Sequence, residues 1–145
     1  MIHRVLTPED AAIAAMFADR LWPGHAAGEL AQEMKASLQN EETALFLAFA
    51  GEKPVGFAQC ALRHDYVEGT STSPVGFLEG VFVEEPYRKN GYARALVEAC
   101  ENWAKEKGCT EFGSDCEIGN TESLRFHLNI GFEEAGRTIW FAKKL

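Results

Sequence analysis

The residues best suited to chemistry lie where an apolar strand pattern runs into a glycine-containing turn. Residues 77–83 read FLEGVFV, and residues 88–94 read RKNGYAR just before an amphipathic helix pattern. A helix N-terminus presents unpaired backbone N–H groups and a partial positive charge, which suit a pyrophosphate. Gly91 lets phosphates approach the backbone closely, and Arg88 and Lys89 add positive charge. The pattern predicts a phosphate-binding turn, although the same spacing also fits a plain strand-to-helix connection.

Two carboxylates stand where they could accept a proton or hold an ammonium group. Glu79 interrupts the apolar strand before the predicted phosphate turn, and Asp115 follows a short strand over residues 111–114. Ligands of α/β proteins often bind beyond the carboxyl edge of the sheet, where Asp115 is expected. The alternatives are a solvent-facing strand position for Glu79 and an ordinary turn aspartate at 115. We expect both carboxylates to act at a binding site.

Residues 120–132 form a second informative pattern, N-x-x-S-x-x-F-H-x-x-I-G-F. Asn120 suits the N-cap of a helix, and Gly131 suits its end. His127 lies on an apolar face of this helix, where we expect it mainly to pack. Histidine is also a competent proton donor near neutral pH, so a catalytic role is the alternative.

The rest of the pattern indicates the elements that position these residues. Strands are expected over 2–6, 44–50, 54–63, 77–83, 111–114 and 137–142, and helices over 8–21, 27–38, 93–107 and 121–130. This order predicts an α/β protein with a mixed sheet. The length of 145 residues fits one domain, residues 1–145.

Composition argues against several classes of protein. A formal net charge of −8 disfavours nucleic-acid binding, and it suits a cationic substrate or solubility alone. No apolar run reaches the ~20 residues of a membrane span, and the N-terminus lacks a signal-peptide core, so we expect a cytoplasmic protein without a membrane partner. The cysteines at 60, 100, 109 and 116 have neither CxxC nor zinc-like spacing, so we expect free thiols and no metal.

On these residues the chain resembles the GNAT superfamily of acetyl-CoA-dependent N-acetyltransferases. Residues 77–94 are similar to the family's acetyl-CoA-binding motif, and residues 120–132 to its following helix with a terminal Gly-Phe. The resemblance implies the GNAT fold, with a mixed, mostly antiparallel sheet flanked by helices, and a strand that opens away from its neighbour to pair with the pantetheine arm. The resemblance implies three groups of acetyl-CoA-binding residues. The pantetheine arm would lie along Val81, Phe82 and Val83, and Asn120 would lie near the thioester. The pyrophosphate would be bound by Arg88, Lys89, Asn90, Gly91, Tyr92, Ala93 and Arg94.

A narrower resemblance is to the aminoglycoside 6'-N-acetyltransferases, which confer antibiotic resistance. It rests on residues 21–25 (LWPGH), 63–69 (RHDYVEG), 73–80 (SPVGFLEG) and 114–115 (SD), which are spread over most of the chain. It implies a homodimer and an aminoglycoside substrate held by Trp22, His25, Tyr66, Glu79 and Asp115. Some relatives carry an acid where this chain has Gly136, so one carboxylate contact would be missing here.

The implied reaction is direct transfer within a ternary complex. Glu79 is the first candidate to accept the amine proton and Asp115 the second, while a backbone N–H near Val81 would hold the oxyanion. No acyl-cysteine is needed. Two other hypotheses remain: a GNAT enzyme for another amine, such as a polyamine or a protein N-terminus, and a CoA-binding module without catalysis. Product masses from a panel of amines with acetyl-CoA would separate the three.

Overall fold

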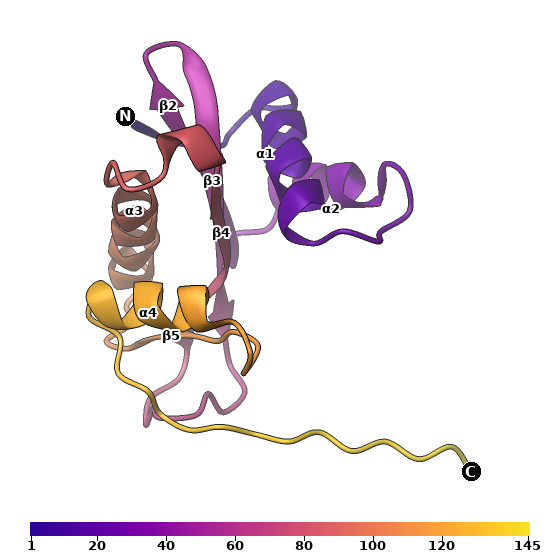
Figure 1. Ribbon diagram of the computed structural model, residues 1–145, viewed down its shortest axis with the longest axis vertical. Helices are drawn as coiled ribbons and strands as arrows, with labels where there is room; N and C mark the ends of the chain where they lie inside the picture. Colours follow the sequence, from indigo (N-terminus) through magenta and orange to yellow (C-terminus); the bar gives the residue numbers. More distant parts are fainter.

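The computed structural model describes residues 1–145 and shows a sheet with helices on both faces (Figure 1). The five strands are β1 (Ile2–Arg4), β2 (Thr43–Ala50), β3 (Lys53–Arg63), β4 (Val75–Val83) and β5 (Phe112–Ser114). They lie side by side in chain order, and every neighbouring pair is antiparallel except β4 and β5. The expected mixed, mostly antiparallel sheet is confirmed.

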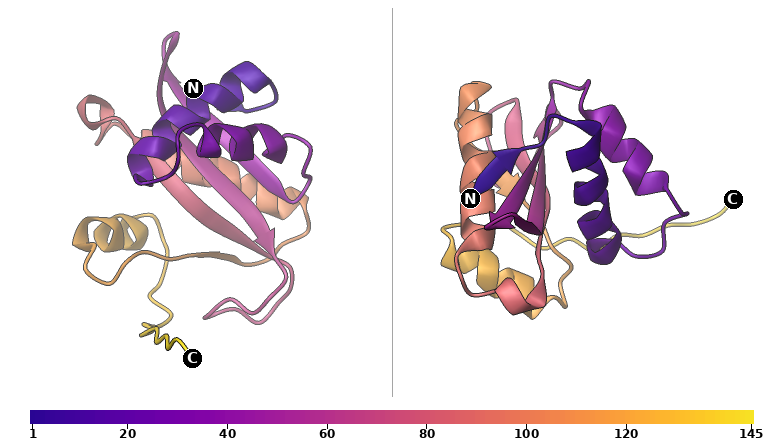
Figure 2. Two further views of the ribbon diagram at one scale, coloured as in Figure 1. Left: turned by 90° about the vertical axis from the view of Figure 1, so that its right-hand side faces the viewer. Right: turned by 90° about the horizontal axis from the view of Figure 1, so that it is seen from above.

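The helices divide between the two faces of the sheet. One face is covered by α1 (Pro8–Leu21) and α2 (Glu29–Ser37), and the other by α3 (Tyr92–Glu106), with α4 (Thr121–Asn129) beside it at the β5 end (Figures 1 and 2). A short 3₁₀ turn, η1 (Glu85–Tyr87), which the sequence pattern did not predict, joins β4 to the turn before α3. None of the helices combines the length and apolar character that crossing a bilayer requires.

The apolar run in β2 is continuous because both faces of this strand are buried. Leu45 and Leu47 pack with α1 and α2, whereas Phe46 and Ala48 pack with α3. Side chains of a strand alternate between its faces, so two hydrophobic cores form on opposite sides of one sheet. Each core holds the helices of one layer against the sheet that contains β4.

Two helix starts follow from their capping residues. The Thr7 hydroxyl accepts a hydrogen bond from the N–H of Asp10 at 3.2 Å, and Pro8 fills the first turn of α1. The Asn120 side chain accepts from the N–H of Ser123 at 3.0 Å, which confirms Asn120 as the N-cap of α4. A cap of this kind contributes about 1 kcal/mol.

The expected strand over 137–142 is wrong for this single chain. Residues 133–145 form neither helix nor strand, and their last part runs away from the body of the protein (Figures 1 and 2). Ile139, Trp140 and Phe141 are 76%, 90% and 91% exposed. A strand persists only where its backbone pairs with another strand, and this segment has no such partner.

Candidate active site

The central feature of the site is a gap that opens between β4 and β5. The two strands pair in parallel only at three successive positions, from Gly76↔Phe112 to Leu78↔Ser114. Beyond Leu78, β4 continues to Val83 with no neighbour on its β5 side. Apart from the Val83 carbonyl, which accepts from Arg88, backbone N–H and C=O groups on that side are free to pair with an extended ligand.

A β-bulge places Glu79 at the start of this gap. Along the β3–β4 ladder, Gln59 pairs with Gly80 and Cys60 pairs with Leu78, so Glu79 is an extra, unpaired residue. A bulge shifts the alternation of side chains and often re-aims one next to an active site. Glu79 and Gly80 consequently both face the α1 side.

The ring of Trp22 lies directly on Gly80 and leaves no room for a side chain at this position. A Cβ at this position would collide with the Trp22 ring and would lie 2.8 Å from the side chain of Leu21. Trp22 is the residue after α1, and its ring also packs edge-on against Phe57, with ring centroids 6.1 Å apart. The packing of α1 therefore brings the predicted substrate residues Trp22 and Glu79 next to each other.

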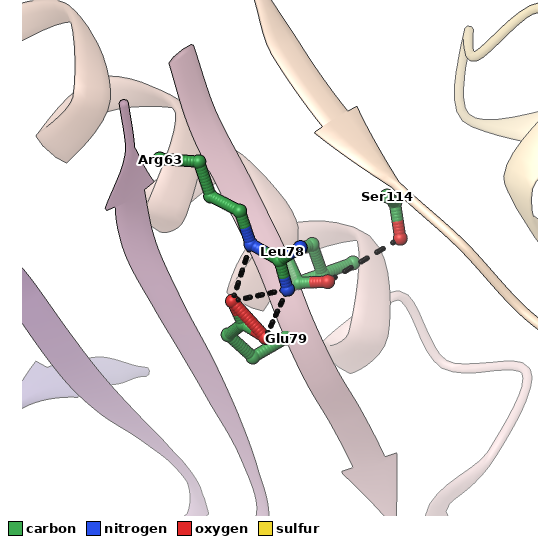
Figure 3. A network of polar contacts seen from close by, with 4 residues as sticks. All are labelled: Arg63, Leu78, Glu79 and Ser114. Atoms are coloured by element: carbon green, nitrogen blue, oxygen red, sulfur yellow. Dashed lines mark hydrogen bonds and ion pairs between the residues drawn. The ribbon is translucent and has the colours of Figure 1, made fainter. Parts of the chain in front are cut away.

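In this structure the Glu79 carboxylate forms an ion pair with Arg63 (Figure 3). Nη2 of Arg63 lies 2.9 Å from both carboxylate oxygens, and Nε lies 3.2 Å from Oε1. The guanidinium also lies over the Phe77 ring, 3.7 Å from its centroid. This partner was not among the residues expected at the site, because nothing in the spacing of residues 63 and 79 indicates that they meet.

The other expected substrate residues are more dispersed. Asp115 follows β5 directly, is exposed, and has neither a hydrogen bond nor an ion pair. Tyr66 is 75% exposed in the loop between β3 and β4. His25 lies between α1 and α2, with Nδ1 3.5 Å from the Glu29 carboxylate. Trp22 packs on Gly80, and Asp115 directly follows Ser114, which pairs with Leu78, so these two lie nearest the Glu79 segment.

The loop that carries Tyr66 is anchored at two points. Val67 is buried against Phe77 and Gly113. The Glu111 carboxylate accepts hydrogen bonds from the N–H of Ser71 at 2.9 Å, and from the N–H and hydroxyl of Thr72. These hydrogen bonds, chiefly that of the hydroxyl, hold the pKa of Glu111 below its usual value. Tyr66 thus projects from a fixed loop.

A carboxylate also stands beside the glycine that the resemblance singled out. A Cβ on Gly136 would lie 3.4 Å from Oε1 of Glu68. A carboxylate from the β3–β4 loop therefore lies close to Gly136, the position at which an acid was expected to be missing.

The turn before α3 has the backbone conformation of an anion site. Lys89 and Gly91 have φ angles of 64° and 84°, and the Asn90 side-chain amide donates to the carbonyls of Tyr87 and Arg88 at 3.1 and 3.0 Å. None of the backbone N–H groups of residues 89–94 has an acceptor within the protein. Successive free N–H groups at a helix N-terminus form a cradle for a phosphate.

The basic residues of this turn have different surroundings. Arg88 donates from Nε to the Val83 carbonyl at 2.8 Å, and Arg94 donates to the Asn129 carbonyl at the end of α4 at 3.1 Å. Lys89 is exposed and has no partner. Arg88 and Arg94 therefore also hold the turn against β4 and α4.

A hydrogen-bonded chain on the opposite face of β5 was not expected from the sequence. Nε2 of His127 lies 2.7 Å from the Ser114 hydroxyl, and its Nδ1 lies 2.7 Å from the Ser123 carbonyl. A carbonyl only accepts, so Nδ1 carries the proton in the neutral ring. The Ser114 hydroxyl lies within hydrogen-bond distance of both Nε2, at 2.7 Å, and the Leu78 carbonyl, at 3.5 Å. His127 also contacts the rings of Phe126 and Phe132, so it packs as expected and is polar as well.

The thiols are poorly placed for nucleophilic chemistry. A hydrogen bond with Cys60 and burial raise the pKa of Cys100, and burial raises that of Cys109. A raised pKa disfavours the reactive thiolate. No His, Cys, Asp and Glu side chains are grouped in a way that could hold a metal ion. Two hollows of about 400 and 360 Å³ lie around α2 and residues 37–45, away from the gap.

Comparison with known proteins identifies close relatives over the whole chain. Residues 12–132 match the model of the acetyltransferase (GNAT) family. The chain is 42% identical over 143 residues to the aminoglycoside N(6')-acetyltransferase type 1 of Stenotrophomonas maltophilia, covering 98% of this chain and 92% of that protein.

Two solved structures share the fold closely. One is AAC(6')-Iy in complex with the bisubstrate analogue CoA-S-monomethyl-acetylneamine, with a TM-score of 0.94, 36% identity, and coverage of 100% of this chain and 98% of that one. The other is the apo aminoglycoside 6'-N-acetyltransferase AAC(6')-IG from Acinetobacter haemolyticus, with a TM-score of 0.91, 34% identity, and coverage of 100% and 99%.

The phosphate cradle predicts the effect of a charge at Gly91. A Cβ at Gly91 would meet no atom within 4 Å, so Gly91→Glu should keep the fold at a modest cost for its φ of 84°, while its carboxylate repels a pyrophosphate. We expect acetyl-CoA binding to be abolished in calorimetry. Gly108→Glu is the matched control, because Gly108 follows the other end of α3 with a φ of 92° and is equally open. Unchanged affinity in Gly91→Glu would remove this turn from the phosphate site.

Proposed function

The chain belongs to the acetyltransferase (GNAT) family, and from this premise we propose that it transfers the acetyl group of acetyl-CoA to the 6'-amine of aminoglycosides. The observation that carries the proposal is the 0.94 TM-score, over the whole chain, to an enzyme bound to an analogue that joins CoA to acetylneamine. Such an activity confers resistance to these antibiotics. Residues 1–145 act as one GNAT domain, which the family match over residues 12–132 supports.

Acetyl-CoA binds along the gap between β4 and β5. Its pantetheine arm pairs with the free backbone edge of Val81, Phe82 and Val83, and its pyrophosphate lies on the N–H groups of residues 89–94. The absence of any internal acceptor for those N–H groups supports this placement. Asn120, at the start of α4, lies toward the thioester end.

The aminoglycoside binds on the α1 side of the gap. Its ammonium groups need carboxylates, which Glu79 and Asp115 supply, and its sugar faces need aromatic rings, which Trp22 and Tyr66 supply. His25 lies at the rim of this surface. The adjacency of Trp22 to the Glu79 bulge and the exposure of Asp115 and Tyr66 support the assignment.

Groups on both faces of the sheet lie near the reacting atoms. On the substrate face, Glu79 accepts the proton of the attacking amine, with Asp115 as the second candidate. A backbone N–H near Val81 donates to the developing oxyanion. On the other face, Ser114 and His127 lie beside the gap, where CoA leaves as a thiolate. The raised pKa values of Cys100 and Cys109 support direct transfer without an acyl-cysteine.

We further propose a homodimer in the cytoplasm. The exposed apolar segment over 137–142 has the pattern of a strand but no partner in its own chain, and a second copy of the chain provides the sheet against which it pairs. Burial of Trp140 and Phe141 would stabilise such a contact by several kcal/mol. Four unpaired cysteines suit a reducing compartment, and the net charge of −8 supports the absence of a nucleic-acid partner.

The regiochemistry tests the function directly. We expect kanamycin-like and tobramycin-like compounds to gain one acetyl group at the 6'-amine, detected by product mass and fragmentation. Compounds with a 6'-hydroxyl should not react at that position, because a hydroxyl is a far weaker nucleophile than an amine. Equal turnover of both classes would contradict the assignment, and exclusive turnover of a polyamine would favour the other-amine hypothesis.

Substitution of either carboxylate should reduce turnover of the aminoglycoside much more than binding of acetyl-CoA. Glu79→Gln removes the charge at nearly constant shape, and we expect kcat to fall by ~10²-fold or more if it accepts the proton. Asp115→Asn should mainly raise KM for the aminoglycoside. Acetyl-CoA affinity should change little in either variant. Glu52→Gln, on the β2–β3 turn, is the control for loss of an exposed charge. If Glu79→Gln changes neither constant, Glu79 is not in the site.

Removal of the C-terminal segment tests the dimer. A variant that ends at Gly136 lacks the exposed apolar residues and should sediment as a monomer, whereas the full chain should sediment as a dimer at micromolar concentration. A variant that ends at Ala142 keeps these residues and should remain dimeric. A full chain that is monomeric, or a dimer that survives truncation at Gly136, would refute this assembly.

A further inference from the structure

The structure holds a resident cation at the carboxylate that a substrate amine must reach. Arg63 is the last residue of β3 and pairs with Val75, so its side chain starts well before Glu79 along β4. It lies over the Phe77 ring. From there it meets Glu79 at the bulge (Figure 3). Val75, Phe77 and Glu79 follow every second position of β4 and share the substrate face.

The ion pair uses both carboxylate oxygens of Glu79, whereas the guanidinium of Arg63 donates from Nε and Nη2 only. Both carboxylate oxygens accept hydrogen bonds from the guanidinium, and Glu79 has no other partner. Arg63 has no hydrogen bond except those to Glu79, and its side chain is 42% exposed. The arginine can therefore leave Glu79 by breaking only this ion pair and its contact with the Phe77 ring.

We propose that Arg63 is an affinity-setting residue that competes with the substrate ammonium group for Glu79. This inference rests on the proposed function. An arriving ammonium group gains the Glu79 carboxylate only by displacing the guanidinium, so the net gain is the difference between two ion pairs. The carboxylate is held in place by Arg63 until the exchange.

The exchange also serves catalysis. An amine must lose its proton before it attacks, and a bare carboxylate would bind the protonated, unreactive form tightly. Tight binding of a ground state lowers KM without raising kcat. By competing for Glu79, Arg63 weakens that ground-state binding, and its departure frees the carboxylate oxygens that accept the proton.

The test is the affinity of neamine in the presence of CoA, measured by calorimetry. We expect Arg63→Met, which keeps the apolar stem over Phe77, to lower Kd roughly three- to tenfold, the range of an exchanged, partly exposed ion pair. KM should fall in parallel, and kcat should not rise. Arg63→Lys keeps a charge but lacks the fork, so its Kd should lie between the two.

Three comparisons distinguish competition from a structural role. The 6'-hydroxyl analogue of neamine carries no charge at this position, so its Kd should change less than about twofold in Arg63→Met. In a Glu79→Gln background, Arg63→Met should have no effect on neamine binding, because the shared partner is gone. Arg20→Met is the matched control, since Arg20 also lies over a phenylalanine, Phe82, and pairs with a β4-proximal carboxylate, Glu84.

The outcomes separate this inference from the proposed function. A wild-type protein that acetylates neamine, with Arg63→Met binding it equally or more weakly, overturns the competition alone. Equal tightening of neamine and its 6'-hydroxyl analogue also overturns it, because that result indicates a steric effect. A wild-type protein that acetylates no aminoglycoside overturns the proposed function, and this inference with it. Thermal unfolding of each variant checks that the fold is retained.

Discussion

The separation of β4 from β5 is the constraint on which the rest of the site depends. Two parallel strands that stayed paired would satisfy each other's backbone groups and leave nothing for a ligand. Here the pairing stops after Leu78 and Ser114, and β4 runs on alone to the turn before α3. One continuous segment of chain thereby offers a free strand edge and, a few residues later, the free N–H groups of a helix start.

The bulge at Glu79 converts this opening into a two-sided site. One extra residue in β4 turns Glu79 and Gly80 to the same face, where Gly80 admits the Trp22 ring and Glu79 meets Arg63. The opposite face carries the Ser114–His127 hydrogen bond. The Glu79 carboxylate and the Ser114–His127 pair thus lie on opposite faces of the sheet, on either side of the opening.

Much of this arrangement was readable from the sequence, because its signals are local. The amphipathic period of α3, the glycine at its start and the Asn120 cap each reflect the backbone within a few residues, and the structure has all three. The continuous apolar run of residues 44–50 indicated a strand, which the structure buries on both faces. Family-specific stretches spread over the chain indicated the chemistry, and the chain is 42% identical over 143 residues to an aminoglycoside N(6')-acetyltransferase.

What the tertiary structure decided are the meetings of residues distant in the chain. Arg63 and Glu79 meet because β3 and β4 are neighbours and a bulge shifts their register, and no periodicity in the sequence encodes that shift. Ser114 meets His127 because α4 packs back on β5. The segment over 137–142 shows the reverse: its strand pattern is correct locally, but a strand also needs a partner, which this chain alone does not supply. Whether a segment is extended or helical depends on residues close to it in sequence. Whether an extended segment pairs into a sheet depends on where the tertiary structure places the edge of another strand.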